Sequence, residues 1–209
     1  YSNINDKVKY LPVVEKNKKV IGVLTANEVN IPINVLNKKI CVIGLGFVGL
    51  TLSLVMADSG YSVCGYDNNK QLIKDLNNLK TPFYEKGLKE YLKRLKNKKL
   101  EFYNKIEEIK ASVFIITVGT PLKKDSKTPD ISSISEVSKK LAKIIKKDDL
   151  VILRSTVPIG TTRNTVKNII EKFSKLKCGI DFYLSFAPER TVEGDAINEI
   201  RSLPQIIGG

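Results

Sequence analysis

Apolar runs and helix-like segments alternate along most of the chain, from about residue 37 onward. Continuous apolar runs such as SVFIITV and LVILRS are typical of strands that a parallel sheet buries on both faces. The segments between them carry apolar residues at helical spacing. The pattern predicts strands at 39–44, 62–67, 100–103, 112–118, 150–155, 181–186 and near 205–208, and helices at 47–59, 69–79, 86–97, 131–146 and 160–174. It therefore predicts an α/β fold with a Rossmann-like, doubly wound parallel sheet.

The first 36 residues follow a different pattern. Residues 11–15 and 20–25 are β-branched runs on either side of a polar turn, which predicts a short β-hairpin arm. Pro32 opposes a continuous helix, so VNIPINVLN is interpreted as a linker. We expect two regions, an arm with its linker at 1–36 and the main domain at 37–209.

A glycine-rich turn lies between the first strand and the first helix predicted in the main domain. Gly44, Gly46 and Gly49 form the pattern G-x-G-x-x-G. The first glycine permits a tight turn, the second lets the backbone approach a pyrophosphate, and the third lets the helix pack against the strand. Asp67 ends the next strand 67 − 49 = 18 residues later, near the spacing of about 20 for a carboxylate that binds the adenosine ribose. Because a carboxylate repels a 2′-phosphate, the pattern predicts NAD rather than NADP, and a turn that serves packing alone is the alternative.

Polar stretches follow three of the later predicted strands: TVGTP, RSTVP and APERTVEG. Loops at the carboxyl ends of parallel strands gather at the cofactor crevice, so we expect their hydroxyls and carboxylates to converge there. Glu189 and Glu193 are four residues apart, which places them on one face if the segment is helical. This set suits alcohol oxidation followed by acyl chemistry on water. Helix capping by Thr156 and a solvated glutamate pair are the structural alternatives.

The charge of the chain does not indicate nucleic-acid binding. The formal net charge is +13, from 35 Lys and Arg against 22 Asp and Glu. The excess is nearly all lysine, whereas base-edge and bidentate phosphate recognition favour arginine. We interpret the lysines as solvated helix faces and expect no nucleic-acid partner.

Other features of composition concern location and completeness. No apolar run approaches the roughly 20 residues that span a bilayer, so we expect no membrane association. Cys41, Cys64 and Cys178 lack metal-like spacing and leave one thiol unpaired in any disulfide scheme, which predicts no metal and suits a reducing cytoplasm. The start at Tyr1 and the end at PQIIGG lead us to expect a fragment.

Eight motifs, in order, resemble those of the nucleotide-sugar 6-dehydrogenases, over about residues 39–209. They are GLGFVGL, GYD, TPFYEKGL, TVGTP, PDISSI, STVPIGTT, PERTVEG and LPQIIGG. This family oxidises UDP-glucose, GDP-mannose or UDP-N-acetylhexosamines to uronic acids for polysaccharide biosynthesis. The resemblance implies an N-terminal NAD-binding domain, two successive hydride transfers to NAD, a thioester on a cysteine that is then hydrolysed, and a homodimer or larger assembly.

The resemblance also implies roles for individual residues. Thr156 matches a threonine that positions a water between nicotinamide and substrate, Glu193 matches a base or water-orienting glutamate, and Glu189 matches a substrate-side carboxylate. The implied catalytic residues are therefore Thr156, Glu189 and Glu193. The implied cofactor-binding residues are Gly44, Gly46, Phe47, Val48, Gly49, Asp67, Lys70, Thr120 and Thr156, and the implied substrate-binding residues are Glu189, Arg190, Thr191, Val192 and Glu193.

The chain departs from the family pattern in several places. The cysteine nucleophile, in a G-G-x-C-x-P-K-D type motif, is not in these residues, so we expect 1–209 alone to be inactive. Leu72 stands where a basic residue often follows the ribose aspartate, which leaves Lys70 as the nearby substitute, and Leu79 stands where glycine is common. PER in place of PEF favours UDP-N-acetylmannosamine or UDP-N-acetylglucosamine as the substrate, with UDP-glucose as the alternative.

The N-terminal stretch LPVVEKNKKVIGVLTANE resembles the second half of a CBS motif, a module that senses adenosine nucleotides. Glu28 stands where that motif usually has an aspartate. A hairpin that merely packs against another segment is the alternative. The resemblance leads to an alternative function of another class: a non-catalytic module in which this arm and the Rossmann domain together sense adenylate or NAD.

Overall fold

The computed structural model describes residues 10–14, 20–25, 38–123, 126 and 128–209. The chain divides into two units, Tyr1–Val35 and Leu36–Gly209. In the first unit, β1 (Tyr10–Val14) and β2 (Val20–Thr25) pair antiparallel, as the sequence pattern predicts. The polar turn of this hairpin, the predicted linker and Glu28 lie outside the described residues.

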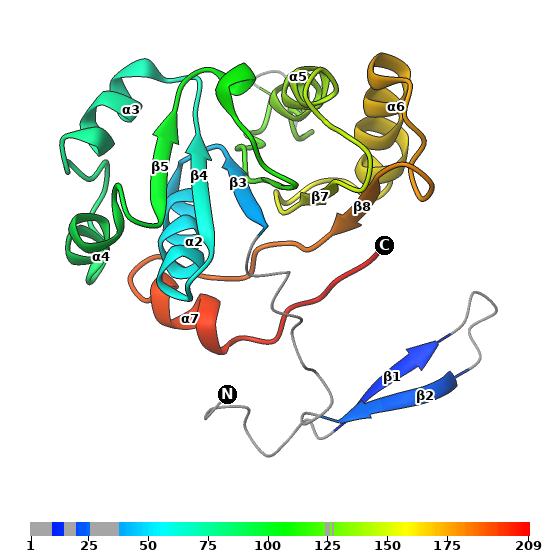
Figure 1. The fold of residues 1–209 in the computed structure, drawn as a ribbon, viewed down its shortest axis with the longest axis horizontal. Helices are drawn as coiled ribbons and strands as arrows, with labels where there is room; N and C mark the ends of the chain where they lie inside the picture. The colour runs from blue at the N-terminus through cyan, green and yellow to red at the C-terminus, as the bar shows by residue number, and fades with distance from the viewer. Residues whose placement is uncertain (1–9, 15–19, 26–37, 124–125, 127) are drawn as a thin grey trace. The chain divides into compact units, whose positions relative to one another are not determined.

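The second unit is built on a six-stranded parallel sheet (Figure 1). Its strands are β3 (Lys39–Ile43), β4 (Ser62–Tyr66), β5 (Leu100–Tyr103), β6 (Val113–Ile116), β7 (Leu150–Leu153) and β8 (Tyr183–Phe186). The spatial order is β5-β4-β3-β6-β7-β8, which confirms the Rossmann-like prediction. The order reverses between β3 and β6, and doubly wound sheets bind their ligands at such a switch point.

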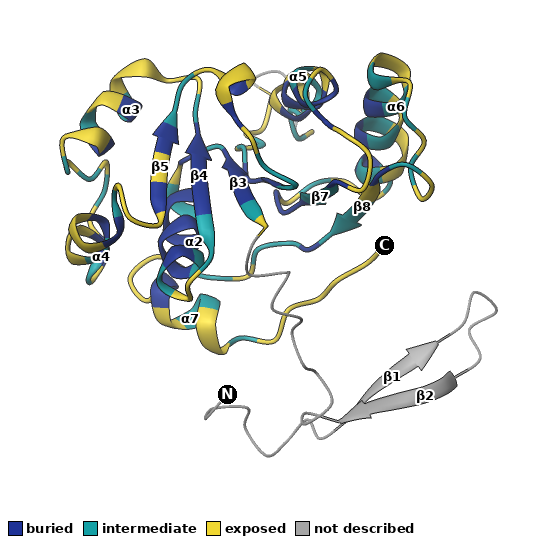
Figure 2. Cartoon of the chain, viewed as in Figure 1, coloured by how far each residue is buried: buried dark blue, intermediate teal, exposed yellow. Residues whose placement is uncertain are grey.

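Helices cover both faces of this sheet, so its central strands are dark blue in Figure 2. The helices are α2 (Phe47–Asp58), α3 (Lys70–Asn77), α4 (Leu88–Leu95), η1 (Ile106–Glu108), α5 (Ser132–Leu141), η2 (Thr161–Lys167), α6 (Asn168–Ser174) and α7 (Ala196–Ser202). Ile43 and Phe114 point to the face covered by α5, η2 and α6. Val42 and Ile115 point to the opposite face, which α2, α3 and α4 cover. The expected helix at 131–146 ends early, at Leu141, and the expected helix at 160–174 begins with the π-helical turn η2.

The strand predicted near 205–208 does not form, so that prediction is wrong. Gly208 alone makes an antiparallel bridge to Phe186, with N–H···O distances of 2.7 and 2.8 Å in the two directions. Ile206 and Ile207 remain 60% and 71% exposed. The apolar run at this position is therefore not buried by a neighbouring layer.

Helix α7 was not expected from the sequence, because a residue far along the chain stabilises its start. The carboxylate of Glu85, only 4% exposed, accepts hydrogen bonds from the N–H groups of Gly194 (2.9 Å) and Ala196 (3.0 Å). The N–H of Ala196, the first residue of α7, is one of the helix's orphan donors and is thereby satisfied, while the bond to Gly194 fixes the chain just before the N-cap Asp195. A cap that comes from about a hundred residues away leaves no local signal in the sequence.

A buried ion pair joins the end of β7 to the loop after β8. Arg154 donates through Nε and Nη2 to Oε2 of Glu189, at 2.8 and 2.6 Å, and both side chains are 7% exposed. Arg154 Nη1 also donates to the carbonyl of Ala187 and to Oε1 of Gln205. One guanidinium therefore holds the loop after β8 and the segment after α7.

The second oxygen of Glu189 is also occupied. Its Oε1 accepts hydrogen bonds from the N–H groups of Arg190 (2.7 Å) and Thr191 (3.0 Å). Burial raises the pKa of Glu189, but the Arg190 N–H, the Arg154 charge and the Thr191 N–H outweigh it and lower the pKa below the ordinary value of 4.5. The carboxylate is held in its ionised form by the N–H groups of its own loop together with Arg154.

We expect Glu189→Gln to lower the free energy of unfolding by about 3 kcal/mol, because it leaves the buried Arg154 charge without its partner. The matched control is Glu193→Gln, four residues further on, whose side chain is exposed and whose loss should change stability by no more than about 0.5 kcal/mol. Urea unfolding at pH 7 measures both. Since the folded pKa of Glu189 is lowered, its contribution is present above pH 4.5 and lost as the pH falls below it. Equal stability of the two variants at pH 7 would contradict this account.

Candidate functional site

Two of the three glycines in the turn between β3 and α2 are required by close packing. Gly44 has φ +96°, and a Cβ there would lie 3.0 Å from Val118. A Cβ on Gly49 would collide with the carbonyl oxygen of Gly44 and lie 2.6 Å from Oγ1 of Thr117. The Thr117 hydroxyl itself donates to the carbonyls of Ile43 (3.0 Å) and Gly44 (2.8 Å). Strand β6 is thus hydrogen-bonded directly to the turn that starts α2.

Gly46 differs from these two, because nothing in the protein requires its lack of a side chain. It is exposed, its φ is −67°, and a Cβ there would meet no atom within 4 Å. Gly46 is the N-cap of α2, and this cap makes no side-chain hydrogen bond. The first turn of α2 contains no acidic residue, so no carboxylate of that turn offsets the positive dipole at this end of the helix. These features fit the pyrophosphate of a dinucleotide.

Three of the predicted cofactor residues lie next to this turn, at the start of α2 and directly after β4. Phe47 and Val48 open α2 and are half-buried, and the ring of Phe47 packs at 5.2 Å against Phe83. Asp67 follows β4, and its carboxylate accepts from the Leu45 N–H (2.8 Å) and the Asn69 N–H (2.9 Å). Each carboxylate oxygen keeps a second acceptor position, which suits ribose hydroxyls.

Lys70 is less closely tied to this site. It is the exposed first residue of α3, whose N-cap is Asn69. Leu72, at the position where a basic residue is frequent, is half-buried and packs against the core under α2 and α3. Leu79, where glycine is frequent, has φ +60°, the left-handed conformation that glycine adopts without strain.

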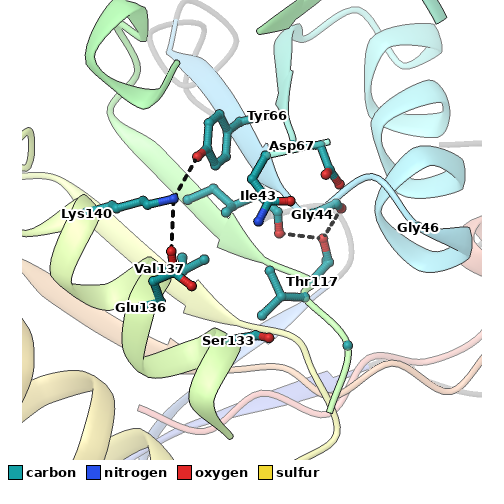
Figure 3. A pocket seen from close by; sticks show the side chains of 13 residues that line it. Ile43, Gly44, Gly46, Tyr66, Asp67, Thr117, Ser133, Glu136, Val137 and Lys140 are labelled. Carbon is teal, nitrogen blue, oxygen red and sulfur yellow. Dashed lines mark hydrogen bonds and ion pairs between the residues drawn. The ribbon is translucent and has the colours of Figure 1, made fainter. Parts of the chain in front are cut away.

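A pocket of about 230 Å³ opens between these elements and α5 (Figure 3). The turn contributes Gly44 and Gly46, and the end of β4 contributes Tyr66 and Asp67. The loop after β6 contributes the segment 117–119, and α5 contributes the opposite wall. Of this α5 wall, only Ser133 belongs to a quoted sequence motif, PDISSI. Glu136 and Lys140 follow that motif, and no local pattern distinguished them from other polar helix residues.

The loops after β6 and β7 are joined by one of the predicted site residues. The hydroxyl of Thr120 donates to the backbone carbonyl of Thr156 at 2.8 Å, and that of Ser155 to the carbonyl of Val118 at 2.6 Å. The side chain of Thr156 is exposed. Helical structure begins only at Thr161, with Gly160 as its N-cap. The alternative that Thr156 caps this helix is therefore wrong.

The PERTVEG loop does not bring its two glutamates together on a helix. Residues 187–195 are not helical, so the condition under which Glu189 and Glu193 would share a helix face is not met. Glu189 is bound by Arg154, whereas Glu193, Val192 and Arg190 are exposed. The role of Arg154 was not predicted, although an arginine directly after the apolar run LVIL indicates a buried charge.

Thr191, the remaining residue of this loop in the predicted set, is half-buried. Its Oγ1 is buried without a hydrogen-bond partner in the described residues. Within the same residues there is no cluster of three or more side chains that could hold a metal, and no helix long and apolar enough to cross a bilayer. Cys41 and Cys64 are free thiols buried in the sheet, and Cys178 is a partly buried free thiol.

Comparisons with known proteins agree with this geometry. Residues 38–209 match the UDP-glucose/GDP-mannose dehydrogenase family, NAD binding domain. The UDP-N-acetyl-D-mannosamine dehydrogenase of Pyrococcus horikoshii is 38% identical over 176 residues, which are 82% of this chain and 41% of that protein. The UDP-N-acetyl-D-glucosamine 6-dehydrogenase of Pseudomonas aeruginosa is 34% identical over 172 residues, which are 82% of this chain and 40% of that protein.

Solved structures give the same result. The P. horikoshii UDP-D-ManNAc dehydrogenase superposes with a TM-score of 0.77 at 36% identity, over 82% of this chain and 41% of that one. A GDP-mannose dehydrogenase from P. aeruginosa gives 0.76 at 31% identity, over 81% and 40%. The chain thus spans about two-fifths of the length of these relatives.

Residues 1–37 lie outside the family match, and the CBS resemblance stays a prediction. The chain belongs to the UDP-glucose/GDP-mannose dehydrogenase family, and residues 38–209 are its NAD-binding domain.

Proposed function

We propose that the chain is the cofactor-binding part of an NAD-dependent 6-dehydrogenase that oxidises a UDP-N-acetylhexosamine to the uronic acid. The observation that carries this proposal is the uncapped start of α2 at Gly46, with Asp67 at the end of the neighbouring strand. The substrate class is supported by the relatives that are named UDP-N-acetyl-D-mannosamine or UDP-N-acetyl-D-glucosamine dehydrogenases. UDP-glucose is the alternative substrate, supported by the solved UDP-glucose dehydrogenase of Pyrobaculum islandicum, 29% identical.

The residues of this chain would bind and orient the reactants. NAD, when bound, supplies the acceptor of the hydride. We assign the N–H groups at the start of α2 to its pyrophosphate, and Asp67 to its adenosine ribose. Thr120 and Thr156 link two loops at the carboxyl edge of the sheet, and we assign Thr156, whose side chain is exposed, to the junction of nicotinamide and substrate.

We assign different roles to the two predicted carboxylates. Both oxygens of Glu189 are occupied by Arg154 and by backbone N–H groups, which supports a positioning role for the loop that would face the substrate. Glu193 is exposed and therefore available to accept a proton from water. The proposal makes Glu193 the base of the hydrolytic step and Glu189 the anchor of its loop, with Arg190, Thr191 and Val192 between them as substrate contacts.

We also propose a cellular location and an oligomeric state for the full-length enzyme. The three free cysteines support a reducing cytoplasmic location, and the family resemblance supports a homodimer or larger assembly of the full-length enzyme. A CBS-like role of the N-terminal arm rests on its sequence alone.

The first test is cofactor choice. Calorimetry on residues 1–209 should give tighter binding of NAD than of NADP, because a like charge within about 4 Å costs on the order of 1 to 4 kcal/mol, or roughly five-fold or more in affinity. Asp67→Asn should reduce this preference, since it removes the charge and keeps an acceptor for the Leu45 N–H. Asp75→Asn, on α3 outside the pocket lining, is the control. Equal affinity of the wild-type chain for the two cofactors would refute the role of Asp67.

The second test concerns Glu193 and uses the full-length enzyme with UDP-N-acetylmannosamine. If Glu193 activates the water that releases the product, Glu193→Gln should slow hydrolysis by about 10² to 10⁴, the usual contribution of a general base. Hydride transfer should proceed, so NADH forms in a burst and then stalls. Intact-mass analysis should find the sugar bound covalently to a cysteine. Turnover at the wild-type rate, with no adduct, would show that this loop has no catalytic role.

A further inference from the structure

One wall of the pocket has no role in the binding scheme above. Helix α5 lines the pocket with Ser133, Glu136, Val137 and Lys140. Their spacing of three, four and seven residues puts them on one face of the helix. The buried residues Ile134 and Leu141 of the same helix pack against the sheet, so α5 is fixed in position.

The ammonium group of Lys140 contacts two other side chains of the pocket. Its Nζ lies 3.4 Å from the phenol oxygen of Tyr66 and 3.3 Å from Oε1 of Glu136. Tyr66 is 4% exposed and belongs to the core of the sheet, so its hydroxyl is a rigid partner. Burial lowers the pKa of Lys140, but its hydrogen bonds to Tyr66 and Glu136 outweigh this and raise it, so the ammonium is charged at neutral pH.

Glu136 and Lys140 line the same pocket as Asp67, which limits the parts of a ligand that they can contact. Tyr66 is the last residue of β4 and directly precedes Asp67, and both line this pocket (Figure 3). The side chains of Val118 and Val137 supply apolar lining in the same pocket. A group joined to a ribose at Asp67 would therefore lie among apolar surfaces, with a carboxylate and an ammonium at one side. Such a setting suits a flat heteroaromatic ring with a donor beside an acceptor on its edge.

We propose that Glu136 and Lys140 recognise the edge of the adenine base, with Glu136 accepting from the 6-amino group and Lys140 donating to a neighbouring ring nitrogen. The inference rests on the proposed binding of NAD at Gly46 and Asp67, and it adds base selectivity to it. Adenine presents an amino donor beside ring-nitrogen acceptors. Hypoxanthine carries an oxygen at position 6 and a hydrogen on N1, so the carboxylate would face an acceptor in place of the amino group.

The effect should be moderate, because the pair is partly solvated. The side chains of Lys140 and Glu136 are 33% and 62% exposed, so solvent weakens their bonds to a ligand. A good base-edge contact is worth about 1 to 3 kcal/mol where it is well buried, and we expect the lower end, a preference of about five- to ten-fold.

The test compares NAD with nicotinamide hypoxanthine dinucleotide, in which an oxygen replaces the 6-amino group of the purine and N1 carries a hydrogen. Calorimetry on residues 1–209 should show the five- to ten-fold preference for NAD derived above. Glu136→Gln should bring the two affinities within about two-fold, because the amide can donate as well as accept. Lys140→Met should weaken the binding of NAD. Lys139→Met, a neighbouring exposed lysine on α5 that does not line the pocket, is the matched control and should change neither affinity.

The outcomes separate this inference from the proposed function. If the wild-type chain binds both dinucleotides equally, or if Glu136→Gln keeps the preference, the base-recognition role is wrong and NAD binding at Gly46 and Asp67 stands. If NAD does not bind at all, the proposed function fails and the inference fails with it. Thermal unfolding of each variant shows whether a lost affinity reflects lost structure.

Discussion

The close contact between the start of α2 and strands β3 and β6 determines the arrangement of the rest of the site. It is possible only because Gly44 and Gly49 lack side chains, and the Thr117 hydroxyl strengthens it with two hydrogen bonds to turn carbonyls. The contact holds the N-terminal end of α2 at the point where the strand order reverses. Asp67, the loop after β6 and the α5 wall then surround that end of the helix because the sheet register places them there.

A second set of interactions organises the loops further along the sheet. Arg154 binds Glu189 and Gln205, and Glu85 binds the N–H groups of Gly194 and Ala196. Both carboxylates are buried, and each of their oxygens accepts at least one hydrogen bond from the protein. Glu193 lies between these two fixed points and is exposed. In the proposed function, the protein-bound Glu189 positions the loop and the exposed Glu193 takes part in the chemistry, although both belong to the same loop.

The sequence predicts the part of the structure that local patterns encode. Buried strands, the glycine turn and the 18-residue interval to Asp67 all depend on residues close in sequence, and the sheet order and turn agree with the predictions. The missed features depend on distant contacts. Helix α7 needs Glu85, and the apolar residues 206–207 stay exposed because no layer covers them. The ion pair of Glu189 with Arg154 was likewise not predicted, because Arg154 lies 35 residues away and follows another strand.

The central claim is that the start of α2 binds the pyrophosphate of NAD and is more than a tight bend. Gly46→Ala tests it directly, because its Cβ would meet no protein atom within 4 Å and its φ of −67° suits alanine. The claim predicts unchanged thermal unfolding together with an affinity for NAD that is weaker by about ten-fold or more in calorimetry, equivalent to at least about 1.4 kcal/mol. A Gly46→Ala chain that binds NAD as tightly as the wild type would contradict it.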